Sequence, residues 1–571
     1  MLRTAFSYGQ TAADMTPQPA ISEALQRAIS AAEAGLFEEA ESDCRQILAA
    51  TPSDAGALCL AGALAARRGD AEGAVARYRA ALALAPRFVK ALSNLGAALS
   101  GLGRFAAAEA PLRLALQEDP QHGPATINLG QVLLAQGRAE EAVELLRRAV
   151  ELSPGDLMAW NNLGAALMRA ERPADAREAL EQALARDPAN PTAWSNLGGV
   201  HHRLGRYGDA ANAFRKALDH GAAAAETLTH LGEALRGMGR YAEALECHAR
   251  SLTLKPDLAD AHFNRALLLL GEGCFAEGWA EYRARPSARA FRARQNVAEA
   301  PRLPAALAGK SVMIAPNQGF GDELFFLRFA PALKARGAKV LYRAGSKIAS
   351  LARQMAALDR VTEGGTDAPA DYTLLVDDLP DALGEAGTPP PVALTPDAQK
   401  LAALRGRLAA LGPAPYLGVT WRGGIDKNGS LFKEAPRAEV ARIAGVWPGT
   451  VLVLQRVPLA GEIAAFAQEA GRAVHDLTAL NDDLEDMLAL LSLLDEYIAV
   501  SNTNVHLRQS LALPSRLLVP MPADWRWMHA GAESPWFPGS RIYRQSADGS
   551  WREALSGLAE DLKAVFSPVL P

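Results

Sequence analysis

The residues best suited to chemistry stand at a few points in the second half of the chain. Asp322 belongs to the run NQGFGDE at 317–323, which follows a short apolar run and precedes a helical pattern. Glycines at such a turn let the backbone approach a ligand closely, and the N–H groups at the start of a helix favour anions. Asp322 could accept a proton from a hydroxyl group there. The alternative is that Asp322 only caps the helix.

Cations and hydrogen-bonding groups follow two later apolar runs. The run GVTWRGG places Trp421 and Arg422 before a glycine turn, and Lys433 follows soon after. These cations could neutralise a diphosphate leaving group, although each taken singly could be an ordinary surface charge. The run SNTNVH at 501–506 sets hydroxyl, amide and imidazole groups at a helix start. Such groups suit phosphate or ribose oxygens, or they simply cap the helix.

Three tryptophans lie further on, in the runs DWRWM at 524–528 and ESPWFPG at 533–539. Their rings could edge a sugar or base site, because an indole offers a flat apolar face. They could equally pack in a core or an interface. The sequence leaves both interpretations open.

Alternating strands and helices must position these groups. From 311 onward, β-branched or apolar runs alternate with helical patterns; they lie at 311–316, 338–344, 372–379, 416–421, 450–455, 496–501 and 515–520. Continuous apolar strands, each followed by a helix, predict parallel sheets covered on both faces. Proline-rich stretches then divide the region, after a linker at 286–305, into two Rossmann-like lobes at 306–410 and 411–571. Ligands in such folds bind beyond the carboxyl ends of strands, so we expect a site in the cleft between the lobes.

The first half of the chain repeats with a period of 34 residues. One glycine series shows it: Gly62, Gly96, Gly130, Gly164, Gly198 and Gly232. Series that start at Gly35, Ala40 and Pro52 keep the same spacing. Glycine inside a helix costs about 1 kcal/mol against alanine, so we expect close helix contact at the first series, with the alanines as its small complement. The second glycine series supplies a turn and the proline ends each unit, so the unit is a helical hairpin.

Trp160 and Trp194 stand four residues before two of the helix-contact glycines. With them, residues 21–285 resemble the tetratricopeptide repeat, with its W-x2-L-G pattern and later Ala and Pro positions. The resemblance implies seven full units and a terminal pair at about 257–285, stacked as an α-solenoid with a concave groove. Residues 1–20 would be an N-terminal extension.

A ladder of carboxamides accompanies the repeats, two residues before each helix-contact glycine. Its members at this spacing are Asn94, Asn128, Asn162, Asn196, His230 and Asn264. A carboxamide on the concave side can donate to and accept from a peptide backbone without reading its sequence, so we predict that the asparagines bind peptide. The ladder resembles that of the O-linked N-acetylglucosamine transferases. The alternative is that the asparagines pack or hydrogen-bond between adjacent repeats.

The order of NQGFGDEL, GVTWRGG, VSNTNVHL, DWRWM and SPWFPG resembles the glycosyltransferase-B region of bacterial tetratricopeptide-repeat glycosyltransferases, over about 305–571. These are related to the ADP-heptose:lipopolysaccharide heptosyltransferases of family 9. The resemblance implies Asp322 as the base and a C-terminal helix that returns to the first lobe. Ser501 stands where those enzymes have Asp, so ADP-heptose is not implied as donor. The donor-binding residues expected are Asn317, Gly319, Gly321, Trp421, Arg422, Lys433, Gln455, Ser501, Asn502, Thr503, Asn504 and His506.

Together these features predict a metal-independent glycosyltransferase that moves a sugar from a nucleotide-sugar to a hydroxyl of a protein held in the repeat groove. No metal or other cofactor is expected, because no clustered His or Cys ligands occur and Asp377-Asp378 is interpreted as a surface turn. One alternative is a non-catalytic repeat scaffold with a degenerate glycosyltransferase domain. Another is a lipopolysaccharide heptosyltransferase with an added interaction arm.

Composition narrows the class of partner. The 571 residues include 59 Lys and Arg against 64 Asp and Glu, a net charge of -5, so no overall positive field favours nucleic acid or an anionic membrane. The four cysteines are too few and too scattered for a disulfide framework or a zinc site. No apolar stretch is long enough to span a membrane, so we expect a cytoplasmic protein. A homo-oligomer stays open.

Overall fold

The computed structural model describes residues 22–295, 302–317, 319–364, 370–423 and 433–565. The chain divides into two compact units, at 1–222 and 223–571. The predicted extension at 1–20 lies outside the described residues, as does Gln318 of the first-lobe motif.

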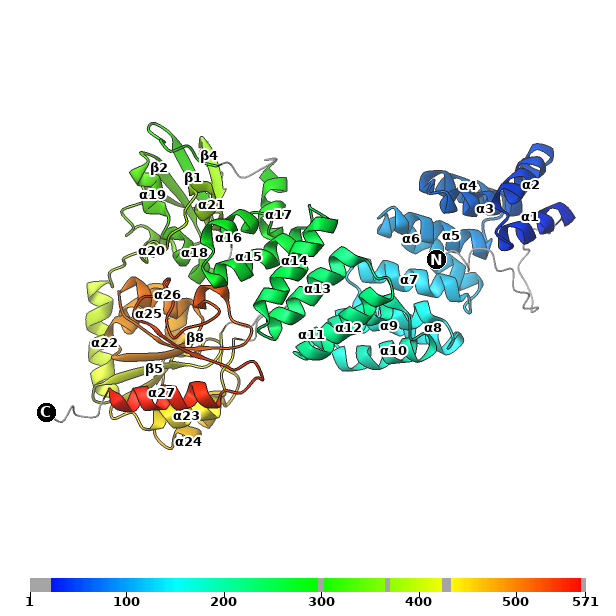
Figure 1. The fold of residues 1–571 in the computed structure, drawn as a ribbon. Coiled ribbons are helices and arrows are strands. Elements are labelled where there is room, and N and C mark those ends of the chain that lie inside the picture. Colours follow the sequence, from blue (N-terminus) through cyan, green and yellow to red (C-terminus); the bar gives the residue numbers. More distant parts are fainter. Residues whose placement is uncertain (1–21, 296–301, 318, 365–369, 424–432, 566–571) are drawn as a thin grey trace. The chain divides into compact units, whose positions relative to one another are not determined.

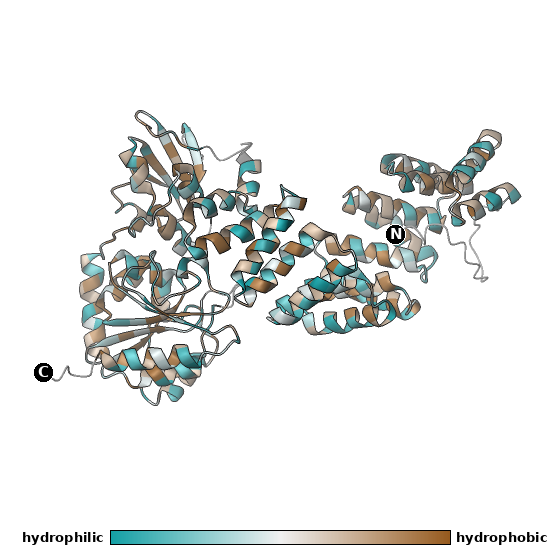
Figure 2. Ribbon diagram, viewed as in Figure 1, coloured by the Kyte–Doolittle hydropathy of each residue, from teal (hydrophilic) through white to brown (hydrophobic). Residues whose placement is uncertain are grey.

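The first unit consists of consecutive antiparallel helix pairs (Figure 1). The pairs are α1 (Glu23–Glu33) with α2 (Phe37–Ala50), α3 (Ala55–Arg67) with α4 (Ala71–Leu84), α5 (Val89–Gly101) with α6 (Phe105–Glu118), α7 (Gly123–Ala135) with α8 (Ala139–Leu152), α9 (Leu157–Arg169) with α10 (Pro173–Arg186), and α11 (Pro191–Arg203) with α12 (Tyr207–Asp219). Hydrophobic and hydrophilic residues alternate along these helices, as expected where one face is buried (Figure 2).

Close packing explains the helix-contact glycines. A Cβ atom on Gly96 would lie 2.3 Å from Leu112 Cγ, and one on Gly130 would lie 2.8 Å from Leu146 Cγ. The predicted close contact is therefore confirmed, but its partner was wrong. The space beside each glycine is filled by a large side chain, which stands four residues after the alanine of the repeat series that starts at Ala40. The alanine itself does not fill it.

The turns follow the repeat pattern as well. Gly69 has a φ of +85°, in the left-handed region that a residue without Cβ adopts most easily, and Glu171 takes the same region with a φ of +57° where the glycine series is interrupted. Trp160 Nε1 donates to the carbonyl oxygen of Pro154 at 2.8 Å, and Trp194 repeats the bond to Pro188. These tryptophans therefore hold the proline turn between hairpins.

The second unit begins with two more hairpins. They are α13 (Ala224–Gly237) with α14 (Tyr241–Leu254), and α15 (Ala259–Glu272) with α16 (Phe275–Tyr282). The predicted linker then starts with a helix, α17 (Pro286–Gln295), whose Ala288 is buried with Ala315 and Leu375 of the first sheet.

The first sheet has four parallel strands in the order β3-β2-β1-β4. The strands are β1 (Ser311–Ala315), β2 (Lys339–Ala344), β3 (Arg360–Glu363) and β4 (Tyr372–Leu375). Short helices accompany them: α18 (Phe320–Leu327), α19 (Ala330–Ala335), α20 (Ala349–Ala352), the 3-10 turn η1 (Val376–Asp378) and α21 (Leu379–Leu383).

The second sheet has six parallel strands in the order β10-β9-β8-β5-β6-β7. They are β5 (Tyr416–Thr420), β6 (Thr450–Val453), β7 (His475–Asp476), β8 (Glu496–Val500), β9 (Arg516–Val519) and β10 (Arg541–Arg544). The other elements of this lobe are α22 (Ala398–Leu411), α23 (Arg437–Gly445), α24 (Glu462–Ala470), η2 (Thr478–Asp482), α25 (Leu484–Leu493), α26 (Thr503–Ser510), η3 (Trp525–Trp527) and α27 (Arg552–Ala564).

Alternating side chains give this sheet two cores. Ile498 and Val500 pack with α23, α24 and α27, whereas Tyr497 and Ala499 pack with α25 and α26 on the other face (Figure 1). The prediction of parallel strands covered on both faces is therefore confirmed for this lobe. Strands β3, β7 and β10 were missed; β7 has two residues, and β3 and β10 have four each.

Two sequence-based expectations were wrong. The C-terminal helix α27 does not return to the first lobe, because Leu555, Leu558 and Leu562 are buried in a core of the second lobe, where α27 contacts β10 and α23. Asp377 and Asp378 are not a surface turn. They are 2% and 4% exposed and pair with the buried Arg285, at 2.5 Å and 2.7 Å.

The helices of the described ranges include none with the length and apolar character of a membrane span.

Candidate functional site

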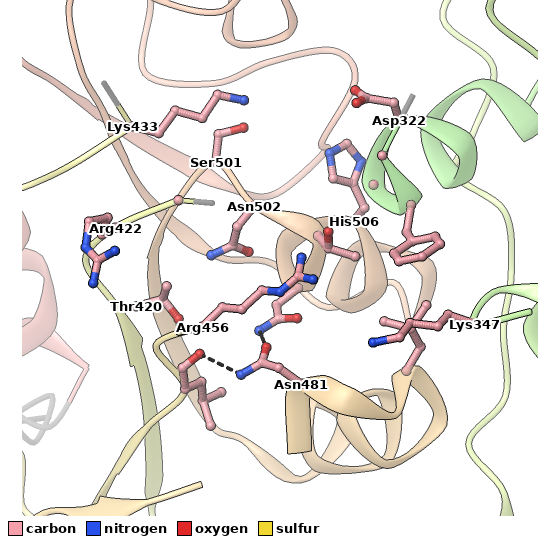
Figure 3. A pocket seen from close by; sticks show the side chains of 18 of the residues that line it. Asp322, Lys347, Thr420, Arg422, Lys433, Arg456, Asn481, Ser501, Asn502 and His506 are labelled. Carbon is pink, nitrogen blue, oxygen red and sulfur yellow. Dashed lines mark hydrogen bonds between the residues drawn. The ribbon is translucent and has the colours of Figure 1, made fainter. Parts of the chain in front are cut away.

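A cavity of about 590 Å³ lies where strands of both sheets end (Figure 3). Its walls follow β1 and β2 in the first lobe and β5, β6 and β8 in the second. The lining residues are Gly319, Phe320, Gly321, Asp322, Lys347, Thr420, Arg422, Gly423, Lys433, Leu454, Arg456, Asn481, Leu484, Ser501, Asn502, Thr503, Asn504, His506 and Arg526. The carboxyl ends of parallel strands are the usual ligand position in such folds.

Most of the predicted site residues line this cavity. They are Gly319, Gly321, Asp322, Arg422, Lys433, Ser501, Asn502, Thr503, Asn504 and His506. These residues, expected from the motifs and the family resemblance, come from separate strand ends and lie around one cavity.

Three predicted donor-binding residues do not line the cavity. Asn317 Nδ2 donates to Asp377 Oδ2 at 2.7 Å. Trp421 is fully buried, and its Nε1 donates to Glu462 Oε1 at 2.8 Å. Gln455 is also buried, and its Oε1 accepts the backbone N–H of Arg422 at 3.0 Å. Each of these side chains holds its own lobe together.

Asp322 lies in the first turn of α18 but does not cap it. The N-cap position belongs to Gly319. Instead, Asp322 Oδ1 accepts from Arg526 Nη2 at 2.6 Å, with the carboxylate side chain 28% exposed. Its Oδ2 has no hydrogen-bond donor in the part of the chain that the structure describes. One carboxylate oxygen is thus fixed and the other is left for a ligand.

The guanidinium that fixes Asp322 is itself held by Asp524. Arg526 is 6% exposed, and its Nη1 donates to both Asp524 oxygens at 3.1 Å and 3.0 Å. Lys433 Nζ lies 3.7 Å from Asp524 Oδ2. Burial alone would raise the pKa of Asp524, but the charges of Arg526 and Lys433 outweigh it and lower the pKa to about 2. A chain of alternating charges therefore runs along this wall.

Beside the segment that carries Lys433, Arg422 is paired with a buried carboxylate. Arg422 Nη2 lies 2.8 Å from Glu462 Oε2, and Leu459 N–H donates to the same oxygen at 2.7 Å. Burial would raise the pKa of Glu462, but these donors, the Trp421 indole and the Arg422 charge lower it overall. Glu462 therefore stays ionised and neutralises Arg422.

The N-terminus of α26 forms another wall of the cavity. Asn502 is its cap and accepts from Val505 N–H at 3.1 Å, as the capping alternative expected. His506 is 8% exposed, and its Nδ1 has no hydrogen-bond partner among the described residues. Burial, with Arg526 and other cations nearby, lowers the pKa of His506 well below its ordinary 6.5. The imidazole is therefore neutral at physiological pH.

Gly321 allows α18 and α26 to approach each other. A Cβ atom there would lie 3.0 Å from His506 Cδ2 and 3.3 Å from the Cα atom of Thr503. The glycine of the first-lobe motif thus sets the contact between the lobes at the cavity wall.

The tryptophans of the late loops are core residues. Trp525, Trp527 and Trp536 are at most 5% exposed. Trp525 packs edge-on against Trp279 of α16, with ring centroids 5.2 Å apart, so the last repeat hairpin contacts the loop that carries Arg526. None of the three rings lines the cavity.

Sequence analysis missed several lining residues, among them Lys347, Arg456, Asn481 and Arg526. Lys347 and Arg456 follow the predicted strands β2 and β6, so the rule that ligands bind at strand ends could have found them. Arg526 stands within a run read for its tryptophans, and nothing in its spacing marks a partner more than 200 residues away at Asp322.

The asparagine ladder is half-buried along the first unit. Asn94, Asn128, Asn162 and Asn196 share this intermediate exposure, and the Nδ2 atoms of Asn94 and Asn162 have no hydrogen-bond partner among the described residues. The Asn94 side chain also reaches Cys59 and Tyr78 of the preceding hairpin. At that position, contact between adjacent repeats is present. Asn264 is half-buried on α15 of the second unit.

Residues 17–302 match the protein family described as the cilia and flagella-associated protein 70 C-terminal domain. The match ends before the first sheet. Protein FlbA of Caulobacter vibrioides is 28% identical over 347 residues, which cover 54% of this chain and 55% of that protein. The chain therefore spans about half the length of this curated relative.

Solved structures resemble parts of the chain. A chain of the APC/C hetero-tetramer Cut9-Hcn1 is 20% identical, with 45% of this chain and 52% of that chain covered and a TM-score of 0.37. PilF of Pseudomonas aeruginosa is 22% identical, with coverage of 36% and 94% and a TM-score of 0.33. The family match and the helical hairpins identify the N-terminal half as a tetratricopeptide-repeat array.

Proposed function

This chain belongs to the family of the cilia and flagella-associated protein 70 C-terminal domain, a tetratricopeptide-repeat family, through residues 17–302. From that premise we propose that the repeats hold a protein acceptor and that the second unit transfers a sugar to it from a nucleotide-sugar. The two sheets with their helices would then be the lobes of a glycosyltransferase-B domain.

One observation carries the proposal. The cavity at the strand ends contains a single carboxylate, Asp322, and several cations within its described lining. A nucleotide-sugar needs this combination, because its diphosphate leaves with negative charge while the attacking hydroxyl must lose a proton. The cavity volume, about 590 Å³, falls within the usual range for a small-molecule site.

The reaction assigns a role to each group. The acceptor oxygen forms a bond to the anomeric carbon, the bond from that carbon to the diphosphate breaks with its electron pair going to the phosphate oxygen, and Asp322 takes the hydroxyl proton. The fixed Oδ1 orients the carboxylate, and Oδ2 receives the proton. Cations and the N-terminus of α26 stabilise the departing nucleotide. His506, being neutral, donates or accepts a hydrogen bond without adding charge.

The repeats supply the second half of the proposal. Consecutive hairpins in tetratricopeptide arrays present surfaces suited to extended polypeptides. The partial exposure of Asn128, Asn162 and Asn196 at one repeat position supports a peptide-binding role for the ladder. Substituting Asn128, Asn162 and Asn196 together by Ala should weaken acceptor binding while the thermal transition is kept. Unchanged binding to an acceptor recovered with the wild-type chain would contradict this role.

A panel of UDP, ADP, GDP and CMP sugars tests the transfer. A donor that binds only the folded chain raises its thermal stability by mass action, and we expect at least one sugar of the panel to do so. We also expect the enzyme to hydrolyse this donor slowly and to release its nucleotide faster when acceptor is present. A panel in which no sugar binds, with the chain folded, would contradict the proposal.

The competing function is a non-catalytic scaffold. The pairing of Asp322 with Arg526 and of Arg422 with Glu462 favours it, because both pairs already satisfy charges that a substrate would use. A scaffold would bind the nucleotide-sugar or the protein partner but would release no nucleotide diphosphate. Turnover separates the two functions.

A further inference from the structure

The cations around the cavity differ in whether a carboxylate already neutralises them. Arg422 lies 2.8 Å from Glu462. Arg526 lies 2.6 Å from Asp322 and 3.0 Å from Asp524. Bringing a further anion to either guanidinium would compete with a bond of good geometry. These arginines therefore mainly hold their carboxylates in position and are less available to bind a further anion.

Lys347 and Arg456 are different. Neither has a carboxylate oxygen within 4.0 Å among the residues that the structure describes. Both side chains are exposed, and both line the cavity. The Lys433 amine is intermediate, at 3.7 Å from Asp524. Among the described residues, two charges at the site are thus left without a carboxylate partner, and neither came from the sequence motifs.

These two charges come from opposite lobes. Lys347 follows β2 of the first sheet, and Arg456 follows β6 of the second. Figure 3 shows their side chains reaching toward the middle of the cavity from different sides. Like charges that face one space repel each other, and an anion between them removes the repulsion and gains from both.

Buried groups at the same cavity also lack partners. His506 is more than nine-tenths buried, lines the cavity, and has an unpartnered Nδ1 within the described residues. The first N–H groups of α26 have no intrahelical acceptor, as at any helix start. A buried polar atom without a partner costs free energy unless a ligand or water satisfies it. The cavity is therefore built for a hydrogen-bonding ligand.

We propose that Lys347 and Arg456 form a clamp, one cation from each lobe, for the diphosphate of a nucleoside diphosphate. The identification of the diphosphate as part of a sugar donor rests on the proposed function. A diphosphate carries charge on two linked phosphoryl groups, and in the clamp each group would contact one of the two cations. Orthophosphate has one phosphoryl group and cannot span the two lobes equally well. The clamp would also hold the lobes at the distance that Gly321 sets.

Inorganic pyrophosphate tests the clamp on the full chain by isothermal titration calorimetry. We expect the wild type to bind pyrophosphate at least about tenfold more tightly than orthophosphate. Lys347→Ala and Arg456→Ala should each weaken pyrophosphate binding by about tenfold, as for loss of one charge-assisted hydrogen bond. The double variant should bind no better than orthophosphate binds the wild type. Affinity should fall as ionic strength rises.

Matched controls come from the same lobes. Lys339 on β2 and Arg442 on α23 are exposed and do not line the cavity, so Lys339→Ala and Arg442→Ala should change the affinity less than twofold. All four side chains are on the surface, so the variants should keep the wild-type thermal transition. A double variant that binds pyrophosphate like the wild type, or a wild type that does not bind it at millimolar concentration, overturns the clamp.

The experiment separates the clamp from the transferase. Pyrophosphate binding that depends on Lys347 and Arg456, in a chain that turns over no nucleotide-sugar, supports the clamp and contradicts the transferase. If the chain transfers sugar but neither substitution changes its affinity for pyrophosphate, the transferase is supported and the clamp is contradicted.

Discussion

Replacing Arg526 by Leu probes the charge chain behind Asp322. The substitution keeps an apolar stem among Phe325 and Trp525 but removes both bonds to Asp524 and the one to Asp322. Removing one partner of a buried ion pair costs about 3–5 kcal/mol, because the other charge stays buried. We therefore expect the second unit to lose a few kcal/mol of stability at pH 7.

The pH dependence gives a sharper result. In the wild type the pKa of Asp524 is lowered from 3.8 to about 2, and each pKa unit corresponds to about 1.4 kcal/mol. Ionised Asp524 therefore stabilises the fold by about 2–3 kcal/mol above pH 4, and this contribution is lost as the pH falls from 4 to 2. Without Arg526, burial dominates and raises the pKa of Asp524 above 3.8. The variant should then gain stability relative to the wild type as the pH falls.

Urea unfolding followed by tryptophan fluorescence measures this, since most tryptophans belong to the second unit. The difference in unfolding free energy between wild type and Arg526→Leu should shrink by at least about 2 kcal/mol between pH 7 and pH 3. Carboxylates that do not contact Arg526 titrate alike in both proteins and cancel. Arg541→Leu is the control, because Arg541 is 58% exposed in its pair with Asp561 and should cost under about 1 kcal/mol. A difference that stays constant with pH would refute the reasoning.

Two further outcomes follow from the packing and the charges. Gly130→Val should destabilise the first unit by about 1–3 kcal/mol, because the added Cβ would lie 2.8 Å from Leu146 Cγ, and a thermal transition unchanged from the wild type would contradict the close contact. His506 should stay neutral at pH 6, because its pKa is well below 6.5, and NMR titration of its ring should show no protonation in that range. A midpoint near 6.5 would mean that the imidazole is not buried beside Arg526.

The repeat half could be predicted almost completely from the sequence. The period of 34 residues defines each hairpin, because three repeated residues mark it: a glycine inside the first helix, a glycine in the turn and a proline that ends the second helix. What the sequence analysis did not identify was the partner of Gly96. Leu112 belongs to a series of large side chains at the same spacing of 34 residues, but their residue types differ, so no single residue type marks the series: Tyr78, Leu112, Leu146, Leu180, Phe214 and His248.

The sheets could be predicted where apolar runs were long. Strands β1, β5 and β8 were found, whereas the edge strand β3 was missed because Val361 is the single apolar residue among its four, Arg360–Glu363. The course of α27 depends on which face of which sheet offers a complementary apolar surface. That is a property of the tertiary structure, and the family resemblance placed α27 against the wrong lobe.

The candidate site was predicted in outline, since strand ends and helix starts have local signatures. Its charge pairing was not. Whether Arg422 is available to a ligand depends on Glu462, which is 40 residues later in the chain and carries no motif. Lys347 and Arg456 follow predicted strand ends, but the structure was needed to show that neither pairs with a carboxylate among the described residues.

The rate of sugar transfer by the Asp322→Asn variant tests the central claim most directly. With a donor found by thermal shift, the account predicts that the substitution lowers the rate of nucleotide diphosphate release to acceptor by about 10²–10⁴-fold, the usual contribution of a general base. Donor affinity should change less than threefold, and Asp482→Asn, an exposed carboxylate outside the cavity lining, should behave as the wild type. Wild-type turnover by Asp322→Asn would contradict the account.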